Sequence, residues 1–381
     1  MNARPQPTML PFIDLAAQRR RLGSAIDTAV SRVLTHCQFI IGPEVRTFES
    51  ELAAFAGSKH AVSCASGTDA LVLGLRALGI GPGDAVICPS FTFCATAEVA
   101  VLVGATPVFV EVLPDTFNID VAGIPGAIEA AKAAGLTPKA IIPVDLFGLP
   151  ADHNAIAKVA ETNGLFVIDD AAQGFGATYH NRRLGTFGDV TCTSLFPAKP
   201  LGCYGDGGAV LTDDDGIADT LRSLRVHGQG SDKYDNVRIG LASRLDTIQA
   251  AVLSEKLKIF PEEIAARDLI ARRYADALKD VVTVPTVPAG LQSVWAQYTI
   301  RLAGGRRDIF AAALKADGIP TAIYYPIPLH RQAAYKHYPA GRAGLAVSDR
   351  LAGEVISLPM HPYLDEPTQA RIVEATRRAL A

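Results

Sequence analysis

Short apolar segments alternate with helical segments along the first half of the chain, and this alternation restricts the fold more than any other feature of the sequence. Strand candidates lie at residues 60–63, 85–88, 106–110, 140–144, 165–168 and 190–195. Helical stretches separate several of them, at residues 95–102, 124–134 and 154–163. Alternation of this kind predicts βα units and a mostly parallel sheet, and strands this apolar predict a sheet that is covered on both faces.

The rest of the chain predicts more helices and a second, smaller unit. Apolar residues recur at helical spacing over 12–36 and 246–280, and further helices are expected at 309–316 and 364–381. Strands are expected at 298–302 and 321–325. A chain of 381 residues exceeds the usual size of one hydrophobic core. We therefore expect a large domain at residues 1–255 and a small C-terminal α/β domain at 256–381.

The composition excludes some classes of function. The net charge of −3 gives no basic excess for nucleic acid or an anionic membrane. No apolar run approaches the ~20 residues that span a bilayer, and the first residues show no signal-peptide pattern. The six cysteines are scattered without CxxC spacing, so we expect no metal site, no disulfides and a cytoplasmic location. The histidines interpreted as surface or helix-cap residues are His36, His60, His153, His180 and His337.

A first candidate for a functional segment is Ser66-Gly67-Thr68, which lies between a predicted strand and an apolar helix. Free N–H groups at a helix N-terminus bind phosphate, and glycine permits a close approach of the backbone. Ser66 or Thr68 would equally serve as an ordinary N-cap. Taken alone, the segment favours the N-cap.

A second candidate is the strand end at Asp169 and Asp170, which Gln173 follows. Ligands of open α/β sheets bind at the carboxyl ends of strands. A carboxylate at this place could keep a pyridinium nitrogen protonated, which makes the ring an electron sink, and Gln173 could hydrogen-bond a ring hydroxyl. A helix N-cap at either aspartate is the alternative, and it is favoured when the segment is taken alone.

The third candidate is Lys199, in the apolar loop that follows the strand candidate at 190–195. Desolvation lowers the pKa of a lysine and makes its amine a nucleophile, whereas an exposed loop lysine is the alternative. A phosphate cup, an acid at a strand end and a later lysine follow the order found in pyridoxal-phosphate (PLP) enzymes of fold type I. Phe91 or Phe93 is available to stack on a cofactor ring, with a place in the core as the alternative.

Together with these segments, nearly the whole chain resembles the DegT/DnrJ/StrS family of nucleotide-sugar aminotransferases. The segments that carry the resemblance are Gly42-Pro43-Glu44-Val45, Ser66-Gly67-Thr68-Asp69-Ala70-Leu71, Pro89-Ser90-Phe91-Thr92-Phe93, Asp170-Ala171-Ala172-Gln173, Phe196-Pro197-Ala198-Lys199, Arg244-Leu245-Asp246-Thr247 and Tyr325-Pro326-Ile327-Pro328-Leu329-His330. The resemblance implies PLP as cofactor and the aspartate-aminotransferase-like fold. That fold has a large domain with a mostly parallel mixed sheet and a smaller C-terminal α/β domain.

The resemblance also implies a role for each residue at the cofactor. Lys199 would form the Schiff base and move the proton, and Asp170 would pair with the pyridine nitrogen. Gln173 would contact the ring oxygen and Phe93 would stack on the ring. The phosphate would be bound by Gly67, Thr68 and Ser194.

For the substrates, the resemblance implies L-glutamate as amine donor and a nucleotide sugar as acceptor. Tyr325 and His330 would lie near the nucleotide sugar. Arg244 would reach the site of a neighbouring subunit, so the functional unit would be a homodimer with shared active sites. The family usually has an asparagine two residues before this arginine, as a phosphate ligand for the partner's cofactor. Here the position is Ala242, with Ser243 or a water as a substitute.

Within the family, residues 197–208, 226–229 and 357–363 are most similar to the 3-aminotransferases of UDP-2-acetamido-2-deoxy-3-oxo-glucuronate. The implied product is a surface polysaccharide such as the O-antigen of a lipopolysaccharide. An aminotransferase of a 3- or 4-keto-6-deoxy sugar linked to dTDP, UDP or GDP is the alternative. Family dehydratases carry histidine where Lys199 stands. A PLP-binding regulatory protein and a desulfurase that uses Cys203 are the weaker alternatives.

Overall fold

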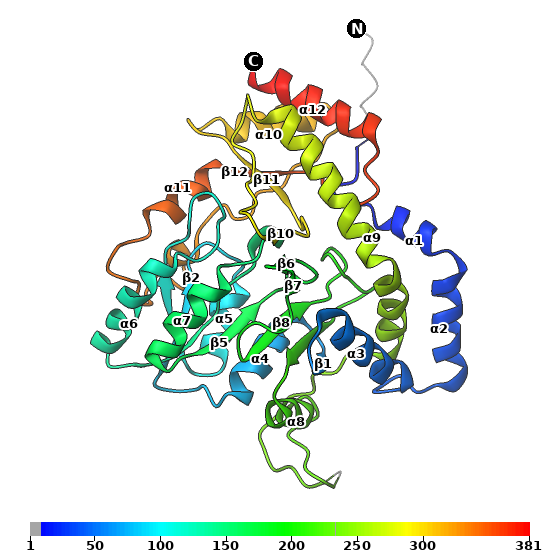
Figure 1. Cartoon of the computed structure of the whole chain (residues 1–381), viewed down its shortest axis with the longest axis vertical. Helices are drawn as coiled ribbons and strands as arrows, with labels where there is room; N and C mark the ends of the chain where they lie inside the picture. Colours follow the sequence, from blue (N-terminus) through cyan, green and yellow to red (C-terminus); the bar gives the residue numbers. More distant parts are fainter. Residues whose placement is uncertain (1–8, 233) are drawn as a thin grey trace.

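The computed structural model describes residues 9–232 and 234–381. Its centre is a seven-stranded sheet with the strand order β1-β9-β8-β5-β4-β2-β3 (Figure 1). The strands are β1 (His60–Cys64), β2 (Asp84–Pro89), β3 (Thr106–Val110), β4 (Thr137–Ile141), β5 (Phe166–Asp170), β8 (Val190–Ser194) and β9 (Gly208–Thr212). Neighbouring strands from β3 to β8 run parallel, whereas β9 is antiparallel to both β8 and β1. The predicted mostly parallel sheet is confirmed.

Helices cover both faces of this sheet because both sets of alternating strand residues are apolar. In β2, Val86 and Cys88 pack with α4 (Gly67–Ala77), α5 (Ala95–Leu102) and α8 (Asp215–Leu224). Ala85 and Ile87 point the other way and pack with α6 (Ile124–Ala133) and α7 (His153–Asn163). On that second face, α3 (Pro43–Ala56) and α9 (Thr247–Leu278) cover β1 and β9.

A smaller unit is built from the C-terminal residues, at the top of Figure 1. The antiparallel pair β11 (Tyr298–Arg301) and β12 (Val355–Leu358) packs with α10 (Arg307–Ala316), α12 (Glu366–Leu380) and the end of α9. We propose that the domain boundary falls within α9, whose first turns contact α2 and α3 instead. The chain later returns to the large unit, where Leu329, Tyr335 and Leu345 join the core around α4 and α5.

The remaining elements are short. They are β6 (Thr178–Tyr179), β7 (Arg182–Arg183) and β10 (Leu291–Gln292), which form a small sheet, α11 (Ala346–Glu354), and the 3₁₀ turns η1 (Val121–Gly123), η2 (Leu146–Gly148) and η3 (Leu329–Arg331). Within the described ranges, no helix has both the length and the apolar character that crossing a membrane requires.

Two expected elements differ from the structure. The helix expected at 12–36 is divided into α1 (Leu15–Leu22) and α2 (Ser24–His36) by Gly23, which has φ 53° and ψ −135°, a conformation that glycine adopts readily. The strand expected at 321–325 does not form; Ala322 makes a single antiparallel bridge to Ser357. Pro320 and Pro326 flank this segment, and a proline has no N–H to extend the ladder.

Candidate active site

A cavity of about 490 Å³ opens at the carboxyl ends of the central strands. Its wall combines the N-terminus of α4, the ends of β5 and β8, the loop that follows β8 and the segment around Tyr325. Eight of the ten predicted site residues line it: Gly67, Thr68, Phe93, Asp170, Gln173, Ser194, Lys199 and Tyr325. The site predicted from separate sequence segments is therefore one place in the structure.

The N-terminus of α4 forms one end of the cavity. The hydroxyl of Ser66 accepts a hydrogen bond from the N–H of Asp69 at 3.1 Å, so the predicted N-cap is present. Gly67 is the first helical residue, and a Cβ at this position would lie 2.6 Å from Cβ of Ser194. The absent side chain lets the end of β8 approach the open helix N-terminus, so capping and anion binding are compatible at this place.

Asp170 lies at the end of β5 and is 5% exposed. Its Oδ2 accepts a hydrogen bond from the hydroxyl of Thr96 at 2.9 Å, and its Oδ1 accepts one from the N–H of Ala172 at 3.2 Å. Burial raises the pKa of Asp170, while these two donors and the nearby Lys199 oppose the rise. The carboxyl group is therefore fixed in orientation and sensitive to any charge placed beside it.

Lys199 enters the cavity from the loop after β8. Its backbone N–H donates to the carbonyl of Phe196 at 2.9 Å, which makes the loop a tight turn. Burial lowers the pKa of the Lys199 amine, and the charge of Asp170 partly opposes this shift. A lysine with a lowered pKa has a larger neutral fraction, which is the form that acts as nucleophile or base.

Gln173 and Tyr325 face each other on the cavity wall. Oε1 of Gln173 accepts from the N–H of Phe147 at 2.7 Å, and its amide nitrogen donates to the Tyr325 hydroxyl at 3.0 Å. The Phe93 ring is 53% exposed, and its centroid lies 6.3 Å from that of Tyr325. Phe91 is fully buried, so the alternative of a core residue holds for Phe91 and not for Phe93.

Two predicted substrate residues do not line the cavity within this chain. The His330 ring lies between the Ser90 hydroxyl at 2.6 Å and Asp349 at 3.2 Å, and burial lowers its pKa. Arg244 is partly exposed outside the cavity wall. The hydroxyl of Ser243, considered above as a substitute for the family's asparagine, already donates to Asp69 at 2.6 Å and is buried.

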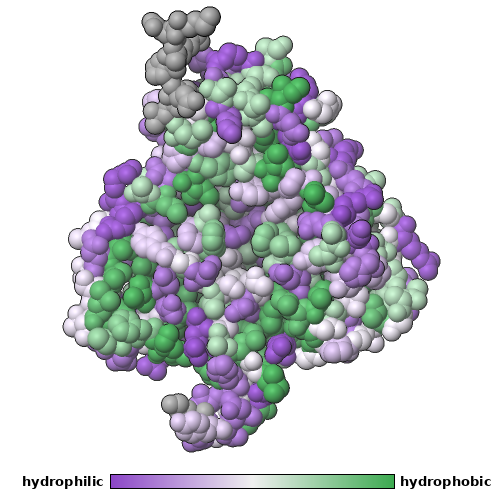
Figure 2. All heavy atoms as spheres, turned by 180° about the vertical axis from the view of Figure 1, so that it is seen from behind, coloured by the Kyte–Doolittle hydropathy of each residue, from purple (hydrophilic) through white to green (hydrophobic). Residues whose placement is uncertain are grey.

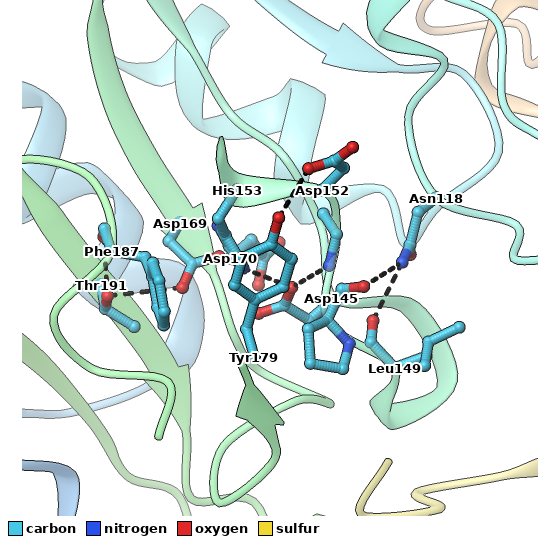
Figure 3. A network of polar contacts seen from close by, with 12 residues as sticks. Asn118, Asp145, Leu149, Asp152, His153, Asp169, Asp170, Tyr179, Phe187 and Thr191 are labelled. Carbon is cyan, nitrogen blue, oxygen red and sulfur yellow. Dashed lines mark hydrogen bonds and ion pairs between the residues drawn. The ribbon is translucent and has the colours of Figure 1, made fainter. Parts of the chain in front are cut away.

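A layer of buried polar residues behind Asp170 was not predicted from the sequence. Thr96 donates to Asp170 directly, while His153 contacts Asp145 at 3.1 Å and lies 4.0 Å from Asp169. Figure 3 draws the last three residues. His153 is 4% exposed, so its interpretation as a surface or cap residue was wrong. The adjacent pair Asp169-Asp170 was the only signal in the sequence. One carboxylate at the strand end is enough to contact a ligand, so the second carboxylate must have another partner.

Comparison with known proteins agrees with this arrangement. The model of the DegT/DnrJ/EryC1/StrS aminotransferase family matches residues 20–377. A protein of Pseudomonas aeruginosa named UDP-2-acetamido-2-deoxy-3-oxo-D-glucuronate aminotransferase is 50% identical, over 94% of this chain and 96% of that protein. A UDP-N-acetyl-3-dehydro-alpha-D-glucosamine 3-aminotransferase of Acidithiobacillus ferrooxidans is 44% identical, over 98% and 99% of the two chains.

Solved structures show the same likeness. A DegT/DnrJ/EryC1/StrS aminotransferase from Brucella abortus is 55% identical, with a TM-score of 0.96 over 98% of this chain and 100% of that one. The NtdA protein of Bacillus subtilis, solved with the bound cofactor PMP, is 29% identical, with a TM-score of 0.88 over 100% and 86% of the chains.

The sheet and these comparisons thus define an aminotransferase with the fold of the PLP-dependent enzymes. More narrowly, the chain belongs to the DegT/DnrJ/EryC1/StrS aminotransferase family, whose curated members include nucleotide-sugar aminotransferases. The family and fold class inferred from the sequence are confirmed.

Proposed function

We propose that this enzyme uses PLP to transfer an amino group from L-glutamate to C3 of UDP-2-acetamido-2-deoxy-3-oxo-glucuronate. The observation that carries the proposal is the placement of Lys199 and Asp170 in one cavity beside the open N-terminus of α4. The name and the 50% identity of the Pseudomonas aeruginosa relative support this choice of sugar.

The residues present fit PLP. A phosphate group fits the N-terminus of α4 at Gly67 and Thr68, next to the hydroxyl of Ser194. The backbone is also close here, since a Cβ on Gly208 would lie 2.2 Å from the carbonyl oxygen of Ser66. A ring between this helix end and Asp170 would lie against the exposed face of Phe93.

When bound, PLP supplies an electron sink that stabilises a carbanion next to the amine. Asp170 would accept a hydrogen bond from a protonated ring nitrogen, and Thr96 and Ala172 hold its carboxylate in place. Lys199 would carry the proton of the transfer, because its amine is tethered in the cavity and its pKa is lowered. Gln173, whose amide nitrogen donates to the Tyr325 hydroxyl, would contact the ring oxygen.

The acceptor sugar brings a diphosphate and a carboxylate, and the cavity of one chain has few cations for them. Among the described residues that line it, Lys199 is the only lysine, arginine or histidine, whereas Asp170 and Asp206 are acidic. We propose that a second copy of the chain completes the site with Arg244, whose planar guanidinium suits a carboxylate.

Exposed apolar side chains support such a homodimer. They include Leu34, Phe39, Ile40, Phe196, Val237 and Ile239. Figure 2 shows hydrophobic residues in several areas on the lower part of one face of the molecule, with polar residues between them. Exposed apolar surface of sufficient extent marks protein interfaces.

The absorption spectrum of the purified protein with added PLP tests the cofactor assignment. We expect a near-visible band that disappears on addition of L-glutamate. A protein that shows no band with PLP would contradict the cofactor, and a band that glutamate leaves unchanged would contradict the donor.

The acceptor is tested with a matched pair of sugars. We expect faster turnover of the 3-oxo-glucuronate than of UDP-N-acetyl-3-dehydroglucosamine, which lacks the carboxylate. Equal or opposite preference would favour the uncharged sugar that the Acidithiobacillus ferrooxidans relative is named for. A further comparison with a dTDP-linked keto-6-deoxy sugar tests the alternative from the sequence.

A further inference from the structure

Three ionisable side chains meet in the protein interior directly behind Asp170. Figure 3 shows Asp145, from the segment after β4, and His153, the first residue of α7, beside Asp169 of β5. Their side chains are 0%, 3% and 0% exposed. Nε2 of His153 lies 3.1 Å from Oδ1 of Asp145 and 4.0 Å from Oδ1 of Asp169.

In each of the two carboxyl groups, one oxygen accepts a hydrogen bond and the other has no partner. Oδ1 of Asp145 also accepts from the N–H of Ala151 at 2.8 Å, and Oδ2 of Asp169 accepts from the Thr191 hydroxyl at 3.4 Å. Oδ2 of Asp145 and Oδ1 of Asp169 are buried without a partner. A proton carried by Asp169 and donated to Asp145 would satisfy both groups, which otherwise bear a desolvation cost.

The electrostatic interactions among these carboxyl groups favour the same protonation of Asp169. Burial raises the pKa of Asp169 well above its ordinary value, and the nearby Asp145 and Asp170 raise it further. Two adjacent ionised carboxylates in a dry site repel each other, so such a pair shares a proton. The single remaining negative charge is then balanced if the His153 ring is an imidazolium, whose Nε2 lies within hydrogen-bond distance of Oδ1 of Asp145.

We propose that Asp145, His153 and Asp169 hold two protons as one electroneutral unit, and that this unit keeps Asp170 ionised toward the ring nitrogen of the cofactor. The second half rests on the proposed function. The three act as positioning residues, because none of them lines the cavity.

Asp170 needs such a neighbour because its own environment disfavours charge. Burial raises the pKa of Asp170, and the charge of Asp145 adds to that rise. A net negative charge behind it would therefore promote protonation of Asp170 and loss of its pairing with a pyridinium. The other titratable groups that face the unit are Tyr179, whose ring centroid lies 5.5 Å from that of His153, Cys192 of β8, and Lys199 beyond Asp170.

The first experiment locates the proton without the cofactor. Asp169→Asn keeps the shape and the neutral charge of a protonated Asp169. Infrared difference spectra of the cofactor-free proteins at neutral pH should show the C=O stretch of a carboxylic acid in the wild type and its loss in the variant. No such band would overturn the shared proton, and so would a stoichiometric, chelator-sensitive divalent metal in the purified protein, since these three residues could also ligate an ion.

The second experiment tests the effect on Asp170 by charge compensation. His153→Gln leaves the Asp145 charge unbalanced, and we expect PLP to bind about tenfold more weakly. With ¹⁵N-labelled PLP, the ring-nitrogen resonance should move from the pyridinium toward the pyridine position. The double variant His153→Gln/Asp145→Asn removes both charges and should restore affinity and resonance.

If the role of these three residues is merely structural, the double variant should bind PLP no better than His153→Gln alone. Asp169→Asn should leave the ring-nitrogen resonance at its wild-type position. A wild-type protein that fails to bind PLP would instead contradict the proposed function, and the infrared result would still decide where the proton lies.

Discussion

At the residue scale, Gly67 occupies a position whose side-chain space is already filled. A Cβ there would lie 2.6 Å from Cβ of Ser194 and 3.1 Å from its Oγ. Gly67→Ala should push β8 away from the N-terminus of α4 and weaken PLP binding by about tenfold or more, since overpacking at a tight contact costs roughly 1–3 kcal/mol. Fluorescence titration of PLP measures the affinity. Gly353→Ala in α11, where a Cβ meets nothing within 4 Å, is the matched control and should bind PLP normally.

Lys199 should be indispensable for turnover while leaving the fold intact. Lys199→Ala removes the only basic side chain among the described residues that line the cavity. We expect turnover to fall by about 10³-fold or more, because a positioned acid–base group alone contributes 10²–10⁴-fold, and the near-visible PLP band to be lost. Lys258→Ala, at an exposed residue of α9 paired with Glu255, should keep both. Turnover that survives in Lys199→Ala would contradict its role.

The residues that could be identified from the sequence are those whose chemical role is indicated by their residue type and by their order in the chain. Asp170 stands at the end of an apolar strand and Lys199 in the apolar loop after another strand, and such positions are visible without coordinates. Thr96 and His153 could not be identified in this way, because each acts through a contact with another element or turn: Thr96 meets Asp170 across 74 residues, and His153 meets Asp145 across 8. A hydroxyl or an imidazole in a helix has no local signature of such a partner.

At the element scale, the loop that carries Lys199 is fastened to α9 by Lys256. Its buried ammonium donates to the carbonyl of Gly202 at 2.6 Å and lies 4.2 Å from the centre of the Tyr204 ring. Burial lowers the pKa of Lys256 from 10.5 to about 8. The folded protein therefore binds fewer protons than the unfolded chain between these values, and its stability rises as the pH increases through this window.

The variant Lys256→Met should abolish that rise. We expect the free energy of unfolding of the wild type to gain on the order of 3 kcal/mol relative to the variant as the pH increases from about 8 to about 10.5. Urea unfolding of both proteins at several pH values measures the difference, and the other alkaline groups cancel in it. Parallel stability curves over this range would show that Lys256 titrates normally.

Helices and strands could be predicted where the spacing of apolar residues and the positions of turn residues indicate the same element. The strands β2, β3 and β5 contain apolar runs between turns, and these strands and β8 each lie close to their expected places. The strand β9 was missed because it follows a glycine-rich loop, and glycine is typical of turns. Its antiparallel direction results from a long-range pairing with β1, from His60↔Thr212 to Cys64↔Gly208, which no local pattern contains.

At the scale of the whole molecule, the cavity presents more negative than positive side chains to a substrate that is itself an anion. Asp170 and Asp206 line it together with Lys199, and Arg244 stands outside. An anionic substrate needs a local positive potential whatever the net charge of the protein. The segment that contains Arg244 is joined to its own large unit by the bridges Val226↔Ala242 and Ile40↔Asp246 and by the hydrogen bond from Ser243 to Asp69, whereas Arg244 itself is partly exposed.

A shared site predicts complementation between two inactive variants. Lys199→Ala keeps Arg244, and Arg244→Ala keeps Lys199, so a mixed dimer assembles one site with both intact residues and one with neither. Random mixing should give about half mixed dimers and restore about a quarter of the wild-type turnover, because each symmetric pair has two equivalent sites. Co-expression with two affinity tags isolates the mixed species, and light scattering checks its mass. If a mixed dimer of the right mass shows no recovery of turnover, Arg244 acts in the site of its own subunit. The charges of the substrate would then require another partner within the chain.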